Sequence, residues 1–343
     1  MRDLDALAWR IYIRYEQRRV KCANCGGIRV ESLDWLAKNP RYTKRFAQQV
    51  GKQCREMSNA AVAEMMYLKR STVKDLDKLY MQELINKYPA STPRVIGIDE
   101  LSIKKGHTYR IIVSDIERGR PIWIGGEGRK KEDLDLFFQV LGVNKSKRIE
   151  LAVMDMWKAF RNSVEKNIPK ANILYDKFHI LNHLSEAMDK VRRSEYKRVS
   201  EKDRSFIKGQ RFTLLSRRAN LNTESKKALK KLLAANKRLN TAYLLKEEFS
   251  QLWDYQSETW ARRFFANWKE KLKWQRLKPF EKFAAMIDKH WDGIASYFLP
   301  KNKVKLGFVE GLNNKVRVIQ RRAYGFHDEE YLKLKILTAF LPK

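Results

Sequence analysis

The sequence predicts an α/β protein in which a mixed β-sheet follows a small all-α region and is interrupted by a long all-α segment. Residues 41–85 show apolar residues at a helical period. Residues 95–175 contain short β-rich segments, the later of which alternate with helical patterns. Between about residues 184 and 300 no strand pattern is found. A length of 343 residues indicates two or three folded units.

Charge is the most extreme property of the chain. It has 72 Lys and Arg residues against 40 Asp and Glu, a net charge of +32, which predicts a polyanionic partner such as nucleic acid or an acidic membrane surface. No apolar run approaches the roughly 18 residues of a membrane span, and the N-terminus lacks a signal-peptide pattern. Three Cys residues are too few for a disulfide framework. We therefore expect a nucleic-acid partner, no membrane association and a cytoplasmic location.

Residues 1–38 predict a partial zinc-ribbon-like segment. A strand-like stretch at 9–15 is followed by a Cys22-x-x-Cys25 turn, which supplies two of the four ligands of a tetrahedral zinc site. The other half is missing, because Cys54 lies 29 residues further on in a helical pattern and no His is nearby. Zinc binding is therefore doubtful, and a metal-free remnant and a site completed by a partner both stay open.

Residues 41–90 predict a helix-turn-helix DNA-binding domain. Phe46, Val50 and Cys54 lie at i, i+4 and i+8 of a first helix, and Ser58 is placed to cap a second. Ser71 is placed to cap a third helix, which would be the recognition helix. An ordinary helical hairpin with a solvated face is the alternative. The polar side of this helix, expected to face a major groove, holds Thr72, Lys74, Asp75 and Lys78, and the DNA contacts are expected from Thr72, Lys74 and Lys78.

Residues 94–183 predict a mixed sheet with flanking helices. The order is βββαβαβα, which is the element order of the ribonuclease-H-like fold, and its first three strands form an antiparallel meander. The predicted strands are 95–103, 109–116, 121–126, 149–154 and 172–175, and the predicted helices are 134–141, 156–166 and a helix from residue 178 onward.

Residues 184–300 predict a basic, Trp-rich helical insertion in this core. Residues 190–239 hold 17 Lys and Arg against four Asp and Glu. A solvated basic face beside an aromatic core explains most of the Trp residues, whereas a surface that follows DNA phosphates explains the charge better. Residues 301–343 return to the core with amphipathic helices at 304–321 and 331–341. The DNA-binding cations predicted in these two regions are Arg192, Arg193, Arg217, Arg218, Lys315, Arg317 and Arg321.

Two acids follow apolar strands that are expected to be neighbours in the sheet. Asp99 and Asp155 would repel each other unless cations held them, which suggests a Mg²⁺ site. Glu310 is the best candidate for a third ligand, with Asn314 and Arg317 on the same helix face. Three such acids are suited to hold two metal ions about 3.5–4 Å apart for phosphodiester displacement. The sequence therefore favours a nuclease or a strand-transfer enzyme.

Other acids lie close to these positions. Glu100 would point to the opposite face of the sheet, where an ion pair is the expected role, and Asp115 ends the second strand, where it is placed to cap a turn. Asp176 and His179 form an Asp-x-x-His at the exit of the fifth strand. This pair is either a metal site or, more often, a hydrogen-bonded brace that orients the following helix.

Several of these motifs together resemble one known family, the bacterial insertion-sequence transposases of the ISL-three family. The resemblance covers nearly the whole chain, although family members usually have an earlier Cys pair, so the first part of the zinc-binding segment is expected to be lacking. The runs that resemble the family are Gly97-Ile98-Asp99-Glu100, Val153-Met154-Asp155-Met156-Trp157, Tyr175-Asp176-Lys177-Phe178-His179-Ile180, Glu310-Gly311-Leu312-Asn313-Asn314-Lys315 and Arg321-Arg322-Ala323-Tyr324-Gly325-Phe326.

The resemblance implies a DDE-type transposase that binds the inverted-repeat ends of an insertion sequence, cleaves the DNA there and joins the 3′-OH ends to target DNA. It implies a triad of Asp99, Asp155 and Glu310 that uses Mg²⁺, with Mn²⁺ as a substitute. Asp176 and His179 would lie near the triad without belonging to it. A bacterial, nucleoid-associated homodimer or higher oligomer on DNA is expected. A nuclease without strand transfer and a non-catalytic repressor derived from a transposase are the alternatives.

Overall fold

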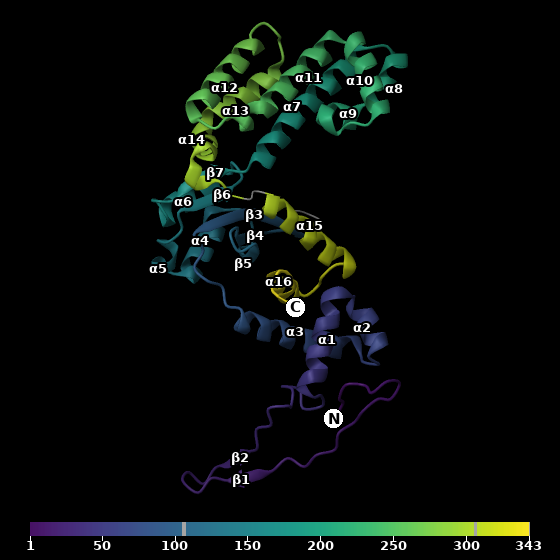
Figure 1. Ribbon diagram of the computed structural model, residues 1–343, viewed down its shortest axis with the longest axis vertical. Helices are drawn as coiled ribbons and strands as arrows, with labels where there is room; N and C mark the ends of the chain where they lie inside the picture. The colour runs from purple at the N-terminus through teal and green to yellow at the C-terminus, as the bar shows by residue number, and fades with distance from the viewer. Residues whose placement is uncertain (105–107, 305–306, 343) are drawn as a thin grey trace. The chain divides into compact units, whose positions relative to one another are not determined.

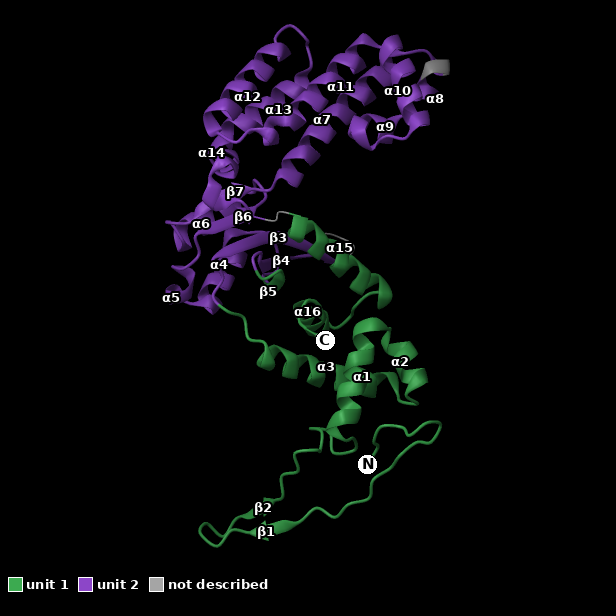
Figure 2. Ribbon diagram, in the orientation of Figure 1, with its two compact units in different colours: residues 1–91, 118–124, 307–343 green, residues 92–117, 125–306 purple. Residues whose placement is uncertain are grey.

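The computed structural model describes residues 1–104, 108–304 and 307–342 (Figure 1). The chain divides into two compact units (Figure 2). Unit 1 comprises residues 1–91, 118–124 and 307–343, and unit 2 comprises residues 92–117 and 125–306. Residues 307–342 thus group with the N-terminal region. Their predicted membership of the catalytic core stays a prediction.

The N-terminal segment contains one short hairpin. Strands β1 (Arg19–Lys21) and β2 (Ile28–Val30) pair antiparallel, and all six of their side chains are exposed. The strand predicted at 9–15 is wrong, because this range makes only isolated bridges, from Trp9 to Ala6 and from Tyr12 to Arg2. Trp9 and Tyr12 are 76% and 67% exposed. The apolar residues that alternate in this range are Trp9, Ile11, Ile13 and Tyr15, and none of them is buried. Without a core to pack against, the pattern does not produce a strand.

Three helices follow, as predicted for residues 41–85: α1 (Lys44–Glu56), α2 (Asn59–Met65) and α3 (Arg70–Lys87). The Ser58 hydroxyl caps α2 by accepting from the backbone N–H of Ala61 at 3.2 Å, which confirms that prediction. The predicted Ser71 cap is wrong. Helix α3 already begins at Arg70, with Lys69 at the N-cap and no side-chain cap, so Ser71 lies within the first turn.

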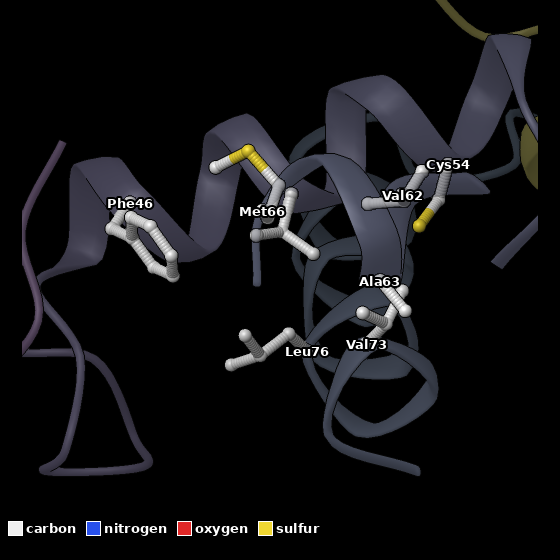
Figure 3. Close-up of a cluster of buried hydrophobic side chains, with 8 residues drawn as sticks. Phe46, Cys54, Val62, Ala63, Met66, Val73 and Leu76 are labelled. Carbon is white, nitrogen blue, oxygen red and sulfur yellow. The ribbon is translucent and has the colours of Figure 1, made fainter. Parts of the chain in front are cut away.

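The three helices enclose an apolar core (Figure 3). Phe46 and Cys54 of α1 face Val62 of α2 and Leu76 of α3, and each is at most 3% exposed. Burial raises the pKa of the Cys54 thiol to about 12, so this thiol is a core residue. A Cβ at Gly51 would overlap the ring of Tyr80 on α3, which explains a glycine in the middle of α1.

Helices α15 (Gly307–Arg322) and α16 (Glu329–Thr338) complete unit 1. They correspond to the predicted C-terminal helices, although residues 305–306 of the first prediction lie outside the described residues. Asp77 of α3 is fully buried and accepts from the Tyr331 hydroxyl and, at 2.6 Å, from the Lys335 ammonium of α16. Burial raises the pKa of Asp77, and its charge adds to burial in raising that of Tyr331. This polar network fixes α16 against α3.

The sheet has the strand order β5-β4-β3-β6-β7. Strand β3 pairs antiparallel with β4 and parallel with β6, and β6 pairs parallel with β7. The prediction that the first and fourth strands of the core are neighbours is therefore confirmed. All four residues of β6 are buried, as expected for a strand covered on both faces. The bounds are β3 Val95–Lys104, β4 Thr108–Asp115, β5 Arg120–Gly125, β6 Leu151–Met154 and β7 Asn172–Tyr175.

Helices alternate with the last strands. They are α4 (Lys131–Leu141), the four-residue α5 (Val143–Ser146), α6 (Lys158–Asn167) and α7 (Lys177–Arg198). Only α5 was not predicted from the sequence. Helix α4 packs against α6, and each helix has buried apolar side chains, such as Leu134 on α4 and Phe160 on α6. A helical region followed by a mixed sheet with helices is consistent with a ribonuclease-H-like core.

From α7 onward the described residues of unit 2 are helical. Helix α7 packs against α11 and α13, and Trp268 lies in the aromatic core with its indole N–H donating to the Leu245 carbonyl at 2.9 Å. No helix of the described ranges has the length and apolar character needed to cross a membrane. The remaining helices are α8 Glu201–Gly209, α9 Arg211–Leu215, α10 Thr223–Ala235, α11 Lys237–Phe249, α12 Glu258–Leu272, α13 Lys278–Lys289 and α14 Trp291–Ala295, with 3-10 turns at Arg218–Asn220, Ser250–Asp254, Ser296–Phe298 and Pro300–Asn302.

Candidate active site

Strand register brings three carboxylates to one edge of the sheet. Ile98 of β3 is opposite Met154 of β6, and Met154 is opposite Tyr175 of β7. The next residue on each strand is an aspartate: Asp99, Asp155 and Asp176. Because the three strands run parallel in this register, the three positions lie side by side, Asp99 within β3 and the other two directly after β6 and β7. The sequence predicted the first two as a pair.

His179 lies between two of these acids. Its Nε2 is 3.9 Å from Asp99 Oδ1, and its Nδ1 is 3.7 Å from Asp155 Oδ2. The ring comes from the first turn of α7, which begins directly after β7. The Asp99 side chain is 8% exposed, whereas those of Asp155 and His179 are 33% and 28% exposed. The site therefore has one buried acid and one that solvent reaches.

Asp176 caps α7 beside this group. Its Oδ1 accepts from the backbone N–H of Phe178 at 2.9 Å. Burial raises the pKa of Asp176, and the negative charges of Asp99 and Asp155 raise it further against the opposing effect of that hydrogen bond and of His179. Three carboxylates are thus near one another at this edge of the sheet, an arrangement that is typical of sites that bind a cation.

Glu100 belongs to a second group beside the two acids. Its carboxylate pairs with the Arg129 guanidinium at 2.9 Å, which fits the ion-pair role expected from the sequence. Burial raises the pKa of Glu100, and Arg129 opposes the shift. Arg129 in turn lies 5.5 Å from the ring of Trp157, whose indole N–H donates to the Arg129 carbonyl at 2.8 Å. Sequence analysis missed Arg129, because a single Arg in a loop carries no periodic signal.

Asp115 and Glu310 belong to other elements, β4 and α15. Asp115 is buried at the end of β4 opposite Ile96, three positions before Asp99 on β3. Glu310 lies in the first turn of α15 in unit 1 and is exposed. On the same helix Arg317 donates to the Asn314 side chain at 3.4 Å, which agrees with the predicted shared face. The place of Glu310 as a third acid stays a prediction.

Two predicted DNA-binding lysines of α3 are already engaged. The ammonium groups of Lys74 and Lys78 lie 2.8 Å and 2.7 Å from Asp328 Oδ2. The hydrogen bond with Asp328 raises the pKa of Lys78, and the two lysines hold the pKa of Asp328 well below its usual range. Thr72 is half-buried. The exposed residues at the start of this helix are Arg70 and Ser71.

The other predicted DNA-binding cations differ in exposure. Arg192 is 8% exposed and donates to Asp189 at 2.8 Å, and Arg193 also pairs with Asp189 at 2.7 Å. Arg217 and Arg218 are exposed at and beside a 3-10 turn. Lys315, Arg317 and Arg321 are exposed on α15, where the Lys315 ammonium donates to the Ala339 carbonyl. Arg192 therefore does not offer its charge to a surface, while most of the others do.

The Cys22 turn holds two thiols. Backbone N–H groups of Cys25 and Asn24 lower the pKa of Cys22, which favours the thiolate form that metals bind. Cys54 is buried in the core of α1 to α3. Within residues 1–104, 108–304 and 307–342, no three His, Cys, Asp or Glu side chains come close enough together to hold a metal ion.

Comparison with known proteins adds evidence that is independent of this geometry. Residues 96–336 match a family model described as a transposase, and residues 31–80 match the helix-turn-helix domain of transposase family ISL3 (ISL-three). The chain belongs to the ISL3 family of transposases. The transposase for insertion sequence element IS1001 of Bordetella parapertussis is 34% identical over 343 residues, which cover 99% of this chain and 84% of that protein.

A second relative supports the same assignment. The transposase for insertion sequence element IS1557 of Mycobacterium tuberculosis is 26% identical over 364 aligned residues, which cover 98% of this chain and 80% of that protein. The protein is therefore a transposase, an enzyme that acts on DNA, and it contains a helix-turn-helix domain. The helix-turn-helix prediction for α1 to α3 is confirmed.

Proposed function

We propose that this transposase binds the inverted-repeat ends of its own insertion sequence, hydrolyses a DNA strand at each end, and uses the released 3′-hydroxyl to attack target DNA. Asp99, Asp155 and Glu310 would be its catalytic acids. The main support is the strand register, which sets Asp99 within β3 beside Asp155, the residue that directly follows β6.

The two acids fit a divalent cation such as Mg²⁺. Their carboxylate oxygens are the hard ligands that Mg²⁺ prefers, and their negative charges add to burial in raising the pKa of Asp176. Two carboxylates are an incomplete ligand set, so at least one further oxygen ligand is needed, for which we propose Glu310. When bound, Mg²⁺ would stabilise the charge that develops on the phosphodiester group.

The residues around the acids would position them. His179 contacts both carboxylates and, since it is anchored at the start of α7, keeps them from separating. Arg129 holds Glu100 in an ion pair, which compensates the charge of that carboxylate beside the two acids. Trp157 is 47% exposed next to this pair and offers a flat surface at the rim of the site. We therefore propose positioning roles for His179 and Arg129.

DNA binding would involve both units. In unit 1 we propose the start of α3, with Thr72, Lys74 and Lys78 as originally predicted, and Lys315, Arg317 and Arg321 of α15. In unit 2 we propose Arg193, Arg217 and Arg218 of the helical segment, which would be an insertion in the ribonuclease-H-like core. Arg192 is omitted because it is buried. A homodimer or higher oligomer on DNA follows from the need to bring two element ends together.

The test uses labelled element-end DNA with Mg²⁺ and then Mn²⁺. Asp99→Asn, Asp155→Asn and Glu310→Gln should each reduce both cleavage and strand transfer below detection, because each removes a metal-ligand charge that both steps require. Affinity for the element end should change less than about twofold. Glu100→Gln is the matched control on the same strand, and it should retain activity. Circular dichroism confirms that each variant is folded.

The outcomes separate the alternatives. Cleavage without a joined product would identify a nuclease, and specific DNA binding without cleavage would identify a repressor. If Glu310→Gln remains active while Asp176→Asn is inactive, the third ligand has been misassigned and Asp176 belongs to the site.

A further inference from the structure

The most exposed tryptophan of the helical segment lies at the turn between α12 and α13. The Trp274 side chain is 94% exposed, compared with 57% for Trp260 on α12 and 8% or less for Trp253, Trp268 and Trp291. An aromatic side chain normally gains a favourable free energy of transfer from water when it is buried on folding. An exposed indole does not gain this free energy. Its exposure is thus a property that the fold of unit 2 does not explain.

The backbone at this turn is strained. Trp274 has φ +70° and Arg276 has φ +52°, in the left-handed region that non-glycine residues rarely adopt. Such conformations are energetically unfavourable and persist where the surrounding structure fixes them. Trp274 therefore combines an unfavourable backbone conformation with an exposed apolar side chain.

The turn is held in place on both sides. Leu272 and Leu277, which precede and follow it, are 3% and 0% exposed. The backbone N–H of Gln275 donates to the Leu272 carbonyl at 3.1 Å, and Arg238 of α11 donates to the Arg276 carbonyl at 2.6 Å. The indole is therefore presented by a rigid turn, which lowers the entropy lost when a partner binds it.

The surroundings of the indole are cationic. Residues 271–278 contain four Lys or Arg residues and no acid. Lys273, Arg276 and Lys278 are all exposed, although Lys273 also lies 2.5 Å from Glu270. A flat aromatic ring among cations is the combination with which proteins bind unstacked bases, because the ring stacks on the base while the cations contact the phosphates.

We propose that Trp274 is a DNA contact that stacks on an unpaired or terminal base, with Arg276 and Lys278 on the adjacent phosphates. The inference rests on the proposed function, because an enzyme that cleaves DNA creates strand ends whose last base has lost a stacking neighbour. A fully paired duplex without ends presents no such base face. Trp274 would therefore distinguish cut or opened DNA from intact DNA.

The experiment compares two DNA probes with the full-length wild-type chain. One is a fully paired duplex whose two ends are closed by linkers that contain no bases, and the other is the same duplex with three unpaired bases, one of them 2-aminopurine. Replacing a stacking aromatic residue by alanine typically costs about 1–3 kcal/mol of binding free energy per base, which is about 5-fold to 150-fold in affinity. The affinity of Trp274→Ala for the second probe should fall by this factor, and its affinity for the first probe should change less than about twofold. Trp274→Phe should retain most of the affinity for the second probe.

Two further measurements sharpen the result. Stacking should quench the 2-aminopurine fluorescence in the wild-type chain and in Trp260→Ala, the matched control on α12, but not in Trp274→Ala. Sedimentation without DNA tests whether the ring contacts a second copy of the chain. Equal affinity of Trp274→Ala and the wild type for the unpaired probe, or a change of oligomeric state in Trp274→Ala, would overturn the proposal.

Failure of this inference is distinguishable from failure of the proposed function. A wild-type chain that cleaves and joins element ends but shows no Trp274 effect refutes the stacking contact alone. A chain in which Asp99→Asn remains active refutes the catalytic assignment, while the fluorescence result still decides the role of Trp274. A wild-type chain that binds neither probe overturns both.

Discussion

Asp328 is the residue that restrains the predicted recognition helix. It accepts from Lys74 and Lys78 and also caps α16 through the backbone N–H of Tyr331 at 3.0 Å. DNA phosphates would have to compete with this carboxylate for the same two ammonium groups. A single acid thus lowers the positive potential of the helix that the family assigns to DNA binding.

Asp328→Asn should therefore strengthen binding to element-end DNA. Asparagine retains the helix cap but removes the charge, so α16 stays in place while both lysines become available. We expect an increase in affinity of about fivefold at low salt, which corresponds to about 1 kcal/mol. Asp75→Asn is the control, because it removes one exposed acid from α3 without releasing an ion pair. Unchanged or weaker binding by Asp328→Asn would contradict the prediction, and Lys74→Ala should weaken binding.

For single residues, the sequence predicts a role where that role depends on the neighbouring residues in the chain. Asp99 and Asp155 were found because each follows an apolar strand that has no use for a charge. The ion pairs of Asp328 and the link between Glu100 and Arg129 were not predictable, because the partners are about 250 and 29 residues apart. Only the three-dimensional arrangement brings such pairs together.

Among the secondary-structure elements, α4 and α6 are joined by one buried acid. Asp135 of α4 accepts from Asn167 at 2.7 Å, from Lys166 of α6 at 3.0 Å, and from the Ser163 hydroxyl at 2.5 Å. Burial raises the pKa of Asp135, but hydrogen bonds from Ser163, the two lysines nearby and Asn167 outweigh it and lower the pKa to about 2. The charged form therefore stabilises the contact between the two helices.

Asp135→Ala should lower the free energy of unfolding by about 2 kcal/mol at neutral pH, as expected for loss of hydrogen bonds to a charged group. The folded-state pKa is below the ordinary value of 3.8, so the wild-type advantage is present above about pH 4 and disappears as the pH falls toward 2. Urea unfolding at several pH values measures this difference. Glu165→Gln, an exposed acid on α6, should change stability by less than about 0.5 kcal/mol. A pH-independent difference for Asp135→Ala would refute the electrostatic explanation.

The sequence predicted most elements of unit 2 because its strands are short apolar runs between clear turns. It was wrong for residues 9–15, where alternating side chains exist without a sheet to bury them, and for Ser71, where a good capping residue lies one position inside the helix. Local patterns indicate what a segment prefers. Whether the preference is realised depends on the surface against which the segment packs.

At the scale of the whole molecule, sequence order and spatial grouping differ. Residues 307–343 follow the sheet and the helical segment in the chain, yet in the structure they group with the N-terminal helices. The polar network of Asp77, Tyr331 and Lys335 explains this grouping, and it joins residues more than 250 positions apart. Helical periodicity predicts α16 itself, but it contains no information on which helix α16 packs against.

Net charge gives the last prediction. A chain of charge +32 that contacts DNA mainly through Lys and Arg releases condensed counterions when it binds, so the logarithm of the binding constant should fall linearly with the logarithm of salt concentration. The slope should be near −0.9 per phosphate neutralised, and six to ten contacts would reduce affinity by about 10³-fold to 10⁵-fold between 50 and 200 mM salt. Arg217→Ala, which removes one exposed cation, should reduce the slope by about 1, whereas Asp99→Asn should leave it unchanged. Fluorescence anisotropy over a salt series measures both quantities. An affinity that does not depend on salt would show that phosphate contacts do not dominate binding, and the excess of positive charge would then need another explanation.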